Sequence, residues 1–220
     1  MRTPVVALTG PSGVGKTTLA RALCALVPTA GSKIVHQDDY FNVKLADPTD
    51  YGPERPNLET PRGVDWPRFV GAIEAARDSL DVRGSDGAST AETGLVVVEG
   101  FLLLASDAAS GHACVLPLFD AIIFLDCPGE ECLRRRLTRN PNRTEEQAAG
   151  LRRYWERCTW PGYLEYTAPV LQQLQDAADE RLVVVDATRS EAEVQSLVTD
   201  AAISHPRLPM LRQYRRSSKL

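Results

Sequence analysis

Short apolar segments rich in β-branched residues alternate with longer segments in which apolar residues recur at helical spacing. The short segments predict five β-strands, at residues 5–9, 33–36, 95–99, 121–125 and 182–185. The longer segments predict helices at residues 16–27, 66–80 and 130–138, an amphipathic helical region within 146–175, and a last helix at 191–203. Strands that alternate with helices favour an α/β fold, with a parallel sheet covered by helices on both faces.

Residues typical of helix N-caps and of turns mark the ends of these elements. Asp65 and Ser190 each stand directly before a predicted helix and are expected to cap it. Residues 81–94 are rich in Gly, Ser, Asp and Thr, which predicts a surface loop. The proline-rich residues 47–63 predict an ordered segment that is not helical.

The first predicted strand leads directly into a glycine-rich loop, and a predicted helix begins at its end. The loop reads Gly10-Pro11-Ser12-Gly13-Val14-Gly15-Lys16-Thr17, and Thr18 follows it. In this strand–loop–helix context the pattern is that of a phosphate-binding loop, whose backbone N–H groups and helix N-terminus point at phosphate oxygens. Lys16 is expected to reach the β- and γ-phosphates, and the Thr17 hydroxyl to bind Mg²⁺. The sequence therefore predicts that the chain binds a nucleoside triphosphate.

Length and composition suit a single compact domain. The chain has 220 residues, 43% of them hydrophobic, which is enough for one core and too little for two full domains. We therefore expect one domain over residues 1–203. From residue 201 onward there is no acidic side chain while basic ones accumulate, so residues 204–220 are expected to form an extended or loosely docked basic tail.

Charge and cysteine content argue against several classes of protein. A formal net charge of −4 gives no sign that nucleic acid or a membrane surface is the main partner. No apolar segment approaches the roughly 18 residues needed to cross a bilayer, and residues 1–4 leave no room for a signal peptide before the first strand. The five cysteines lack C-x-x-C spacing, which predicts reduced, mostly buried thiols in an intracellular protein.

Two clusters of carboxylates follow predicted strands. Asp38 and Asp39 come directly after the second strand, and Glu99 ends the third. Ligands of parallel sheets bind beyond the carboxyl ends of the strands, so these groups are expected near the phosphate loop, to hold a metal and to deprotonate an acceptor hydroxyl. For Asp38 and Asp39 the alternative is turn formation, which we expect to apply to one of them. For Glu99 it is a strand-end carboxylate in water.

Several segments in order along residues 5–198 resemble the nicotinamide riboside kinases, a branch of the uridine kinase and phosphoribulokinase group of P-loop kinases. Besides the phosphate loop they are Gln37-Asp-Asp-Tyr-Phe41, Val98-Glu-Gly-Phe-Leu-Leu103, Glu130-Glu-Cys-Leu-Arg-Arg-Arg-Leu-Thr-Arg139, Trp160-Pro-Gly-Tyr-Leu164 and Val185-Asp-Ala-Thr-Arg-Ser190. The resemblance implies a five-stranded parallel sheet in the order 2-3-1-4-5 with a mobile lid at about residues 139–148. It also implies ATP-dependent phosphorylation of a ribosyl 5′-hydroxyl in NAD biosynthesis.

The resemblance also implies roles for particular residues. Asp38 matches the catalytic base, acting with Lys16 and Arg136, and Glu99 matches a carboxylate linked to the Mg²⁺ that Thr17 binds. Arg134, Arg139 and Arg189 are expected to bind ATP together with the phosphate loop. The residues expected at the acceptor are Asp38, Tyr40, Glu59, Asp65, Arg136 and Trp160.

The sequence departs from the family in the acceptor-binding segment. Glu59 replaces an Asp that binds the ribose hydroxyls, and Leu58 replaces an aromatic residue that stacks on the nicotinamide. Asp65 can be aligned as the ribose ligand instead of Glu59. Base stacking is therefore expected to be weak, so that nicotinic acid riboside and nicotinamide riboside are phosphorylated with similar efficiency.

Other interpretations stay open. Glu130 with Arg134 and Glu131 with Arg135 form i,i+4 pairs that could simply solubilise a helix. A GTPase would carry Asn-Lys-x-Asp, which does not occur, and a mechanical ATPase would have Asp-Glu after the third strand, where this chain has Glu99-Gly100. Uridine/cytidine kinase, or another small-metabolite kinase of the group, is the alternative to a nicotinamide riboside kinase.

The last three residues are Ser218-Lys219-Leu220. In a eukaryotic protein this tripeptide is an address for peroxisomes, read by an import receptor. We expect a peroxisomal or glycosomal protein, with that receptor as partner, if the source is eukaryotic, and a cytoplasmic protein otherwise.

Overall fold

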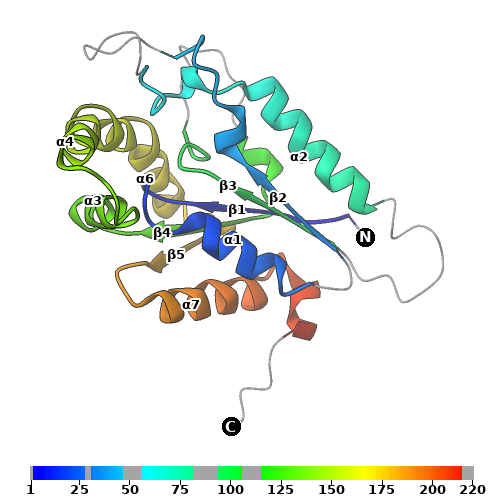
Figure 1. The fold of residues 1–220 in the computed structure, drawn as a ribbon. Helices are drawn as coiled ribbons and strands as arrows, with labels where there is room; N and C mark the ends of the chain where they lie inside the picture. The colour runs from blue at the N-terminus through cyan, green and yellow to red at the C-terminus, as the bar shows by residue number, and fades with distance from the viewer. Residues whose placement is uncertain (1, 28–30, 47–55, 82–93, 106–114, 215–220) are drawn as a thin grey trace.

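The computed structural model describes residues 2–27, 31–46, 56–81, 94–105 and 115–214. Its strands are β1 (Val5–Thr9), β2 (Ser32–His36), β3 (Leu95–Glu99), β4 (Ala121–Asp126) and β5 (Leu182–Asp186). All neighbours pair in parallel, in the order β2-β3-β1-β4-β5 (Figure 1). The predicted fold class and strand order are therefore confirmed.

The helices follow the predicted pattern, with two differences. They are α1 (Lys16–Cys24), α2 (Trp66–Asp81), α3 (Gly129–Thr138), α4 (Glu145–Tyr154), α5 (Trp160–Gly162), α6 (Ala168–Asp176) and α7 (Glu191–Ser204). First, α1 ends three residues earlier than predicted. Second, the amphipathic region is a continuous helical run in which π-helical turns, at Trp155–Thr159 and Tyr163–Thr167, separate α4, α5 and α6.

The sheet is the middle of three layers. Side chains of Val6 and Leu8 pack into a cluster with α1 and α7, whereas Val5 and Ala7 pack into a second cluster with α2 and α6. This alternation follows from the two-residue period of a strand, and helices cover both faces. All residues of the central strand β1 are therefore buried. The carboxyl ends of the strands point toward α3 and α4 (Figure 1).

Both predicted N-caps are present. The Ser190 hydroxyl accepts a hydrogen bond from the backbone N–H of Glu193, and the Glu193 carboxylate accepts one from the backbone N–H of Ser190, which completes a capping box on α7. Asp65 precedes α2, and its Oδ1 accepts from the N–H of Arg68 at 3.3 Å.

The expectation of an extended or loosely docked tail is wrong as far as the structure describes it, to residue 214. After α7 the chain forms a 3₁₀ turn, Pro209–Tyr214, that packs against α7. Leu208 and Leu211 are fully buried in the cluster beneath α1 and α7, because burial of two leucines outweighs the cost of ordering a short segment. The Ser218-Lys219-Leu220 tripeptide lies outside the described residues.

Three further expectations concern the loop at 81–94, the cysteines and the absence of a membrane-spanning segment. The predicted loop at 81–94 falls almost wholly outside the described residues. Cys24, Cys127, Cys132 and Cys158 are free thiols, three of them buried, as predicted. No helix among the described residues has the length and apolar character needed to cross a membrane.

Candidate active site

The phosphate-binding loop turns between β1 and α1 and rests on α3. Gly13 has a φ of +92°, in the left-handed region that favours glycine. A Cβ at this position would lie 2.7 Å from Cγ of Arg136 and 2.8 Å from the carbonyl oxygen of Cys132. Gly13 therefore allows both the turn of the loop and its close approach to α3.

Lys16 places a buried ammonium group on this loop. Its Nζ donates to the carbonyl oxygens of Gly10 at 3.0 Å and Pro11 at 2.9 Å, and the residue is 8% exposed. Burial lowers the pKa of Lys16, and the nearby Glu99 and Asp38 carboxylates oppose this shift. The side chain lines the large cavity described below, where a phosphate oxygen could replace the carbonyls.

Thr17 and Glu99 meet beside this lysine. The Thr17 hydroxyl donates to Oε1 of Glu99 at 3.0 Å, and Nδ1 of His36 lies 2.7 Å from the same oxygen. Oxygen donors suit Mg²⁺, which commonly takes only one or two protein groups and completes its shell with phosphates and water. Thr17 and Glu99 therefore fit a Mg²⁺ that also contacts ATP. Sequence reasoning gave His36 no role, because its contact partner is 63 residues away.

The turn after β2 separates the two adjacent aspartates. Gln37 is fully buried, and its Oε1 accepts from the N–H of Leu102 at 3.0 Å, which anchors the 3₁₀ turn Gln37–Tyr40 to the end of β3. Both aspartates are exposed, but only Asp38 lines the cavity. Partial desolvation in the cavity and the Glu99 carboxylate raise the pKa of Asp38 above its ordinary value.

One cavity of about 1130 Å³ extends from the phosphate loop to Asp38, Phe41, Leu58, Glu59 and Phe101. We call the part formed by these residues the acceptor end. The described residues that line it come from the loop, the strand ends, the segment before α2, and α3 and α4. From the loop they are Ser12, Gly13, Gly15, Lys16, Thr17 and Thr18. From the strand ends and the following segments they are Asp38, Phe41, Val43, Pro56, Leu58, Glu59, Glu99 and Phe101. From α3 and α4 they are Arg135, Arg136, Arg139, Asn140, Arg143, Gln147, Leu151 and Tyr154.

Glu59 rather than Asp65 faces this cavity. Glu59 is 6% exposed, its Oε1 accepts from the Thr159 hydroxyl at 3.0 Å, and its Oε2 has no hydrogen-bond partner among the described residues. Burial raises the pKa of Glu59, and Arg136 opposes that shift. Asp65 is occupied as the cap of α2 and is absent from the lining. Of the two candidate ribose ligands, Glu59 is therefore the one that lies in the cavity.

Two aromatic residues expected at the acceptor lie elsewhere. Tyr40 packs against Phe69 of α2, with ring centroids 5.2 Å apart. Trp160 stacks between Trp155 and Tyr163, at centroid distances of 5.9 and 4.8 Å. Neither Tyr40 nor Trp160 lines the cavity. Both are used for packing because large rings contribute most when they are buried.

Phe41 and Phe101 form the aromatic wall that sequence reasoning missed. Their rings stack with centroids 5.6 Å apart and planes 19° apart, and both line the cavity. Each directly follows a strand-end motif, Phe41 after Asp38-Asp39-Tyr40 and Phe101 after Glu99-Gly100. That position was the available signal, since residues just beyond strand ends border the ligand edge of a parallel sheet.

The arginines of α3 and the segment after it close over the loop. Arg136 donates through Nη1 to the Ser12 hydroxyl at 2.8 Å, and its guanidinium lies 5.8 Å from the Trp155 ring centroid. Arg143 donates to the carbonyl oxygen of Arg136 at 3.1 Å. Arg136 lines the cavity from α3, and Arg139 and Arg143 line it from the segment expected as a lid. Their positive charge suits the phosphates of ATP.

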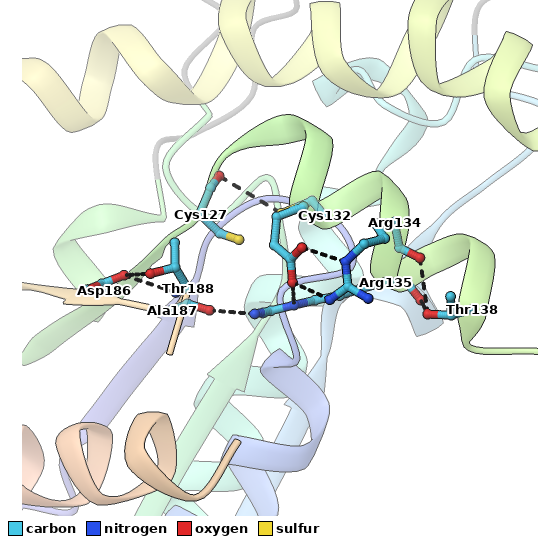
Figure 2. Close-up of polar contacts among 9 residues, drawn as sticks. Cys127, Cys132, Arg134, Arg135, Thr138, Asp186, Ala187 and Thr188 are labelled. Carbon is cyan, nitrogen blue, oxygen red and sulfur yellow. Dashed lines mark hydrogen bonds and ion pairs between the residues drawn. The ribbon is translucent and has the colours of Figure 1, made fainter. Parts of the chain in front are cut away.

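A second cavity of about 520 Å³ lies on the other side of the loop and includes Arg134, Arg135, Thr188 and Arg189. Figure 2 shows how Arg135 bridges α3 to the segment after β5, donating to the carbonyl oxygen of Ala187 at 2.9 Å. Arg134 pairs with Glu131, at 2.7 Å, rather than with Glu130 as expected. Glu131 also accepts from Arg135, so one carboxylate orders both arginines. Arg134, Arg135 and Arg189 line this second cavity, where they could contact the part of a nucleotide that lies beyond its phosphates.

Comparison with known proteins agrees with this geometry. Residues 6–156 match the family described as AAA domain. A uridine kinase of Ureaplasma parvum is 21% identical over 75% of this chain and 82% of its own length. A uridine kinase of Deinococcus deserti is 23% identical over 94% of this chain and 92% of its own.

A solved structure shares the fold. A protein of Silicibacter sp. TM1040, described as a fructose transport system kinase, superposes with a TM-score of 0.50 at 20% identity over 69% of this chain and 80% of its own. The phosphate loop and the carboxylates that line the same cavity suit ATP as a co-substrate. The chain therefore belongs to the AAA domain family and has the fold of the P-loop kinases, and it is similar to uridine kinases over most of its length.

Proposed function

We propose that this protein transfers the γ-phosphate of ATP to the ribosyl 5′-hydroxyl of a nucleoside, with nicotinamide riboside as its acceptor. The observation that carries the proposal is that Lys16, Asp38 and Glu59 face one cavity. Lys16 marks the phosphate end, and Asp38 stands between the two ends. Glu59 offers a buried carboxylate oxygen without a partner, which a sugar hydroxyl would satisfy.

Asp38 is suited to accept the proton of the attacking hydroxyl. It lines the cavity beside Glu99, and its raised pKa makes it a stronger base than an ordinary aspartate. Lys16, Arg136, Arg139 and Arg143 supply positive charge for the phosphates, which is most of what phosphoryl transfer needs from a protein. When bound at Thr17 and Glu99, Mg²⁺ would further neutralise the phosphate charge.

The acceptor end favours a cationic aromatic ring. Phe41 and Phe101 present aromatic surface, and Asp38 and Glu59 add negative charge in the same cavity. The pyridinium ring of nicotinamide riboside is positively charged and would gain from both features. Phe41, Phe101, Val43 and Leu58 carry no hydrogen-bonding side-chain group, so nicotinic acid riboside should also be accepted.

Uridine, with cytidine, is the second candidate acceptor. The relatives described as uridine kinases favour it, since they cover most of the chain. A neutral pyrimidine can stack on Phe41 and Phe101, but it gains less from the negative charge of Asp38 and Glu59.

The acceptor is identified by ADP release in a coupled assay with ATP, Mg²⁺ and a panel of nucleosides. The panel contains nicotinamide riboside, nicotinic acid riboside, uridine, cytidine and, as an acceptor without ribose, pantothenate. We expect the highest kcat/KM with nicotinamide riboside and no turnover by Lys16→Ala. A clear preference for uridine over both pyridine ribosides would replace the first candidate with the second. Turnover of pantothenate alone would refute a nucleoside kinase.

A further inference from the structure

The helical run beside the acceptor end contains a turn of unusual pitch. In an α-helix residues five apart point about 140° away from each other, because each residue adds about 100°. In the π-helical turn Trp155–Thr159 the N–H of Trp160 donates to the carbonyl oxygen of Trp155, five residues earlier. A π-helical turn rotates less per residue than an α-helix, so it brings residues five apart toward the same face. Tyr154 and Thr159 therefore lie on the same side of the helix.

Both of these side chains hold the segment that carries Glu59. The hydroxyl of Tyr154 accepts from the N–H of Leu58 at 3.2 Å, and the hydroxyl of Thr159 donates to Oε1 of Glu59 at 3.0 Å. Gly162 lies against the same segment, since a Cβ there would come within 2.5 Å of the carbonyl oxygen of Glu59. Three positions of one helical run thus fix the Leu58–Glu59 backbone and one oxygen of the carboxylate.

The second π-helical turn, Tyr163–Thr167, is built in the same way. Each turn ends in a buried threonine whose hydroxyl donates to a residue that lines the cavity. Thr159 donates to Glu59, and Thr167 donates to the carbonyl oxygen of Phe101 at 3.2 Å. The recurrence associates the unusual pitch with the cavity rather than with core packing alone.

The contacts leave the Glu59 carboxylate held at one oxygen only. Oε1 is occupied by Thr159, while Oε2 is buried, has no partner in the described part of the chain and belongs to a residue that lines the cavity. A buried carboxylate oxygen without a hydrogen bond is costly, and a ligand hydroxyl would remove that cost. Without the Thr159 hydroxyl, neither oxygen would be fixed in direction.

We infer that Thr159, presented by the π-helical turn, is a positioning residue that aims the free oxygen of Glu59 at a ribose hydroxyl of the acceptor. The inference rests on the proposed nucleoside kinase function. Thr159 acts through Glu59 and touches neither the phosphates nor the base Asp38. Its loss should therefore affect acceptor binding and sugar discrimination, and leave ATP binding unchanged.

The test compares Thr159→Val, which keeps the shape and removes the hydroxyl, with Thr159→Ser, which restores it. For Thr159→Val we expect the KM of the acceptor to rise about 10- to 100-fold, the range for loss of a hydrogen bond to a charged group. The KM of ATP should change less than twofold. Thr159→Ser should stay within about threefold of the wild type. Thr138→Val, whose exposed hydroxyl bonds to the carbonyl oxygen of Arg134 in its own helix, is the matched control.

Two further readouts separate positioning from a purely structural role. The wild type should prefer the ribonucleoside to its 2′- or 3′-deoxy analogue, and Thr159→Val should reduce that preference toward one. In a Glu59→Ala background, Thr159→Val should add little to the rise in KM, because the carboxylate that Thr159 positions is already absent. Equal loss with ribo- and deoxynucleosides together with a lowered melting temperature would assign Thr159 to folding and overturn the inference.

The outcomes also separate this inference from the proposed function. If the wild type phosphorylates a nucleoside and Thr159→Val keeps its acceptor KM and sugar preference, the positioning role is wrong and the kinase function stands. If the wild type phosphorylates no nucleoside in the panel, the proposed function is wrong, and the role of Thr159 toward a ribose hydroxyl is refuted with it.

Discussion

Asp38 and Asp39 are neighbours in the chain but differ in what surrounds them. Both residues are exposed, but only Asp38 lines the cavity, because the buried Gln37 anchors the turn between β2 and the segment that follows. The sequence predicted that one of the pair would serve the turn, and it assigned the base to Asp38 only through the family resemblance.

Asp38→Asn should lower kcat by about 10²- to 10⁴-fold, since a positioned base contributes that much to proton transfer. The KM of ATP should stay nearly unchanged, because Asp38 bonds to no residue of the phosphate loop in the described structure. Asp39→Asn is the control and should retain most of the activity. Steady-state kinetics of both variants measure the difference, and a larger loss in Asp39→Asn would reverse the assignment.

Glu99→Gln tests the metal-linked role of the strand-end carboxylate. The substitution keeps the size of a side chain that is 6% exposed but removes its charge, so the concentration of Mg²⁺ needed for half-maximal turnover should rise several-fold. Titration of Mg²⁺ at saturating ATP measures this shift. An unchanged Mg²⁺ requirement would show that Glu99 does not hold the ion.

Among the elements, the phosphate loop depends most on one backbone conformation. Gly13 combines a left-handed φ with close approach to Arg136 and to the carbonyl oxygen of Cys132 in α3. A glycine-rich motif predicted the turn, but only the packed structure shows that α3 leaves no room for a side chain there.

Gly13→Ala should lower the free energy of unfolding by roughly 1–3 kcal/mol, the cost of a strained conformation, and weaken ATP binding at least about tenfold. Gly71→Ala is the matched control, because Gly71 lies in α2 and a Cβ added there would meet nothing within 4 Å. That change should be neutral or stabilise by about 0.5–1 kcal/mol. Denaturant unfolding and calorimetric ATP titration of both variants measure the contrast, and equal behaviour would contradict it.

The docked segment after α7 ties the far end of the chain to the sheet. His205 is 2% exposed, its Nδ1 accepts from the N–H of Arg207 at 3.2 Å, and its Nε2 lies 3.2 Å from the carbonyl oxygen of Arg181. A backbone N–H can only donate, so Nδ1 carries no proton and Nε2 donates. Both hydrogen bonds of the docked segment therefore use the neutral imidazole ring. Burial lowers the pKa of His205 below 6.5.

Because this pKa is lowered in the folded state, the stabilisation from neutral His205 is fully present above about pH 6.5 and is lost as the pH falls through the folded value. The melting temperature should therefore decrease between pH 7.5 and pH 5. His205→Gln, which cannot titrate, should show a smaller decrease over the same range. An identical decrease in both proteins would exclude His205 as a source of the pH dependence.

Local patterns were sufficient for most of the fold and for the phosphate end of the site. Strand composition placed β1 and β3 at their observed bounds, and the strand–loop–helix motif placed Lys16 and Thr17. These features depend on residues close together in the chain, where backbone preferences and the period of apolar residues act directly. The parallel arrangement of the strands follows from the same patterns, and their order came from the family resemblance.

Contacts between distant residues required the folded structure. Glu59 reaches Thr159 across 100 residues, His36 reaches Glu99 across 63, and Phe41 meets Phe101. The π-helical turn that presents Thr159 and the burial of Leu211 likewise have no local signature in the sequence. Each results from packing between elements, in which burial and hydrogen bonding to a distant partner outweigh local preference. The acceptor end is made of such contacts, whereas the phosphate end is encoded in one loop.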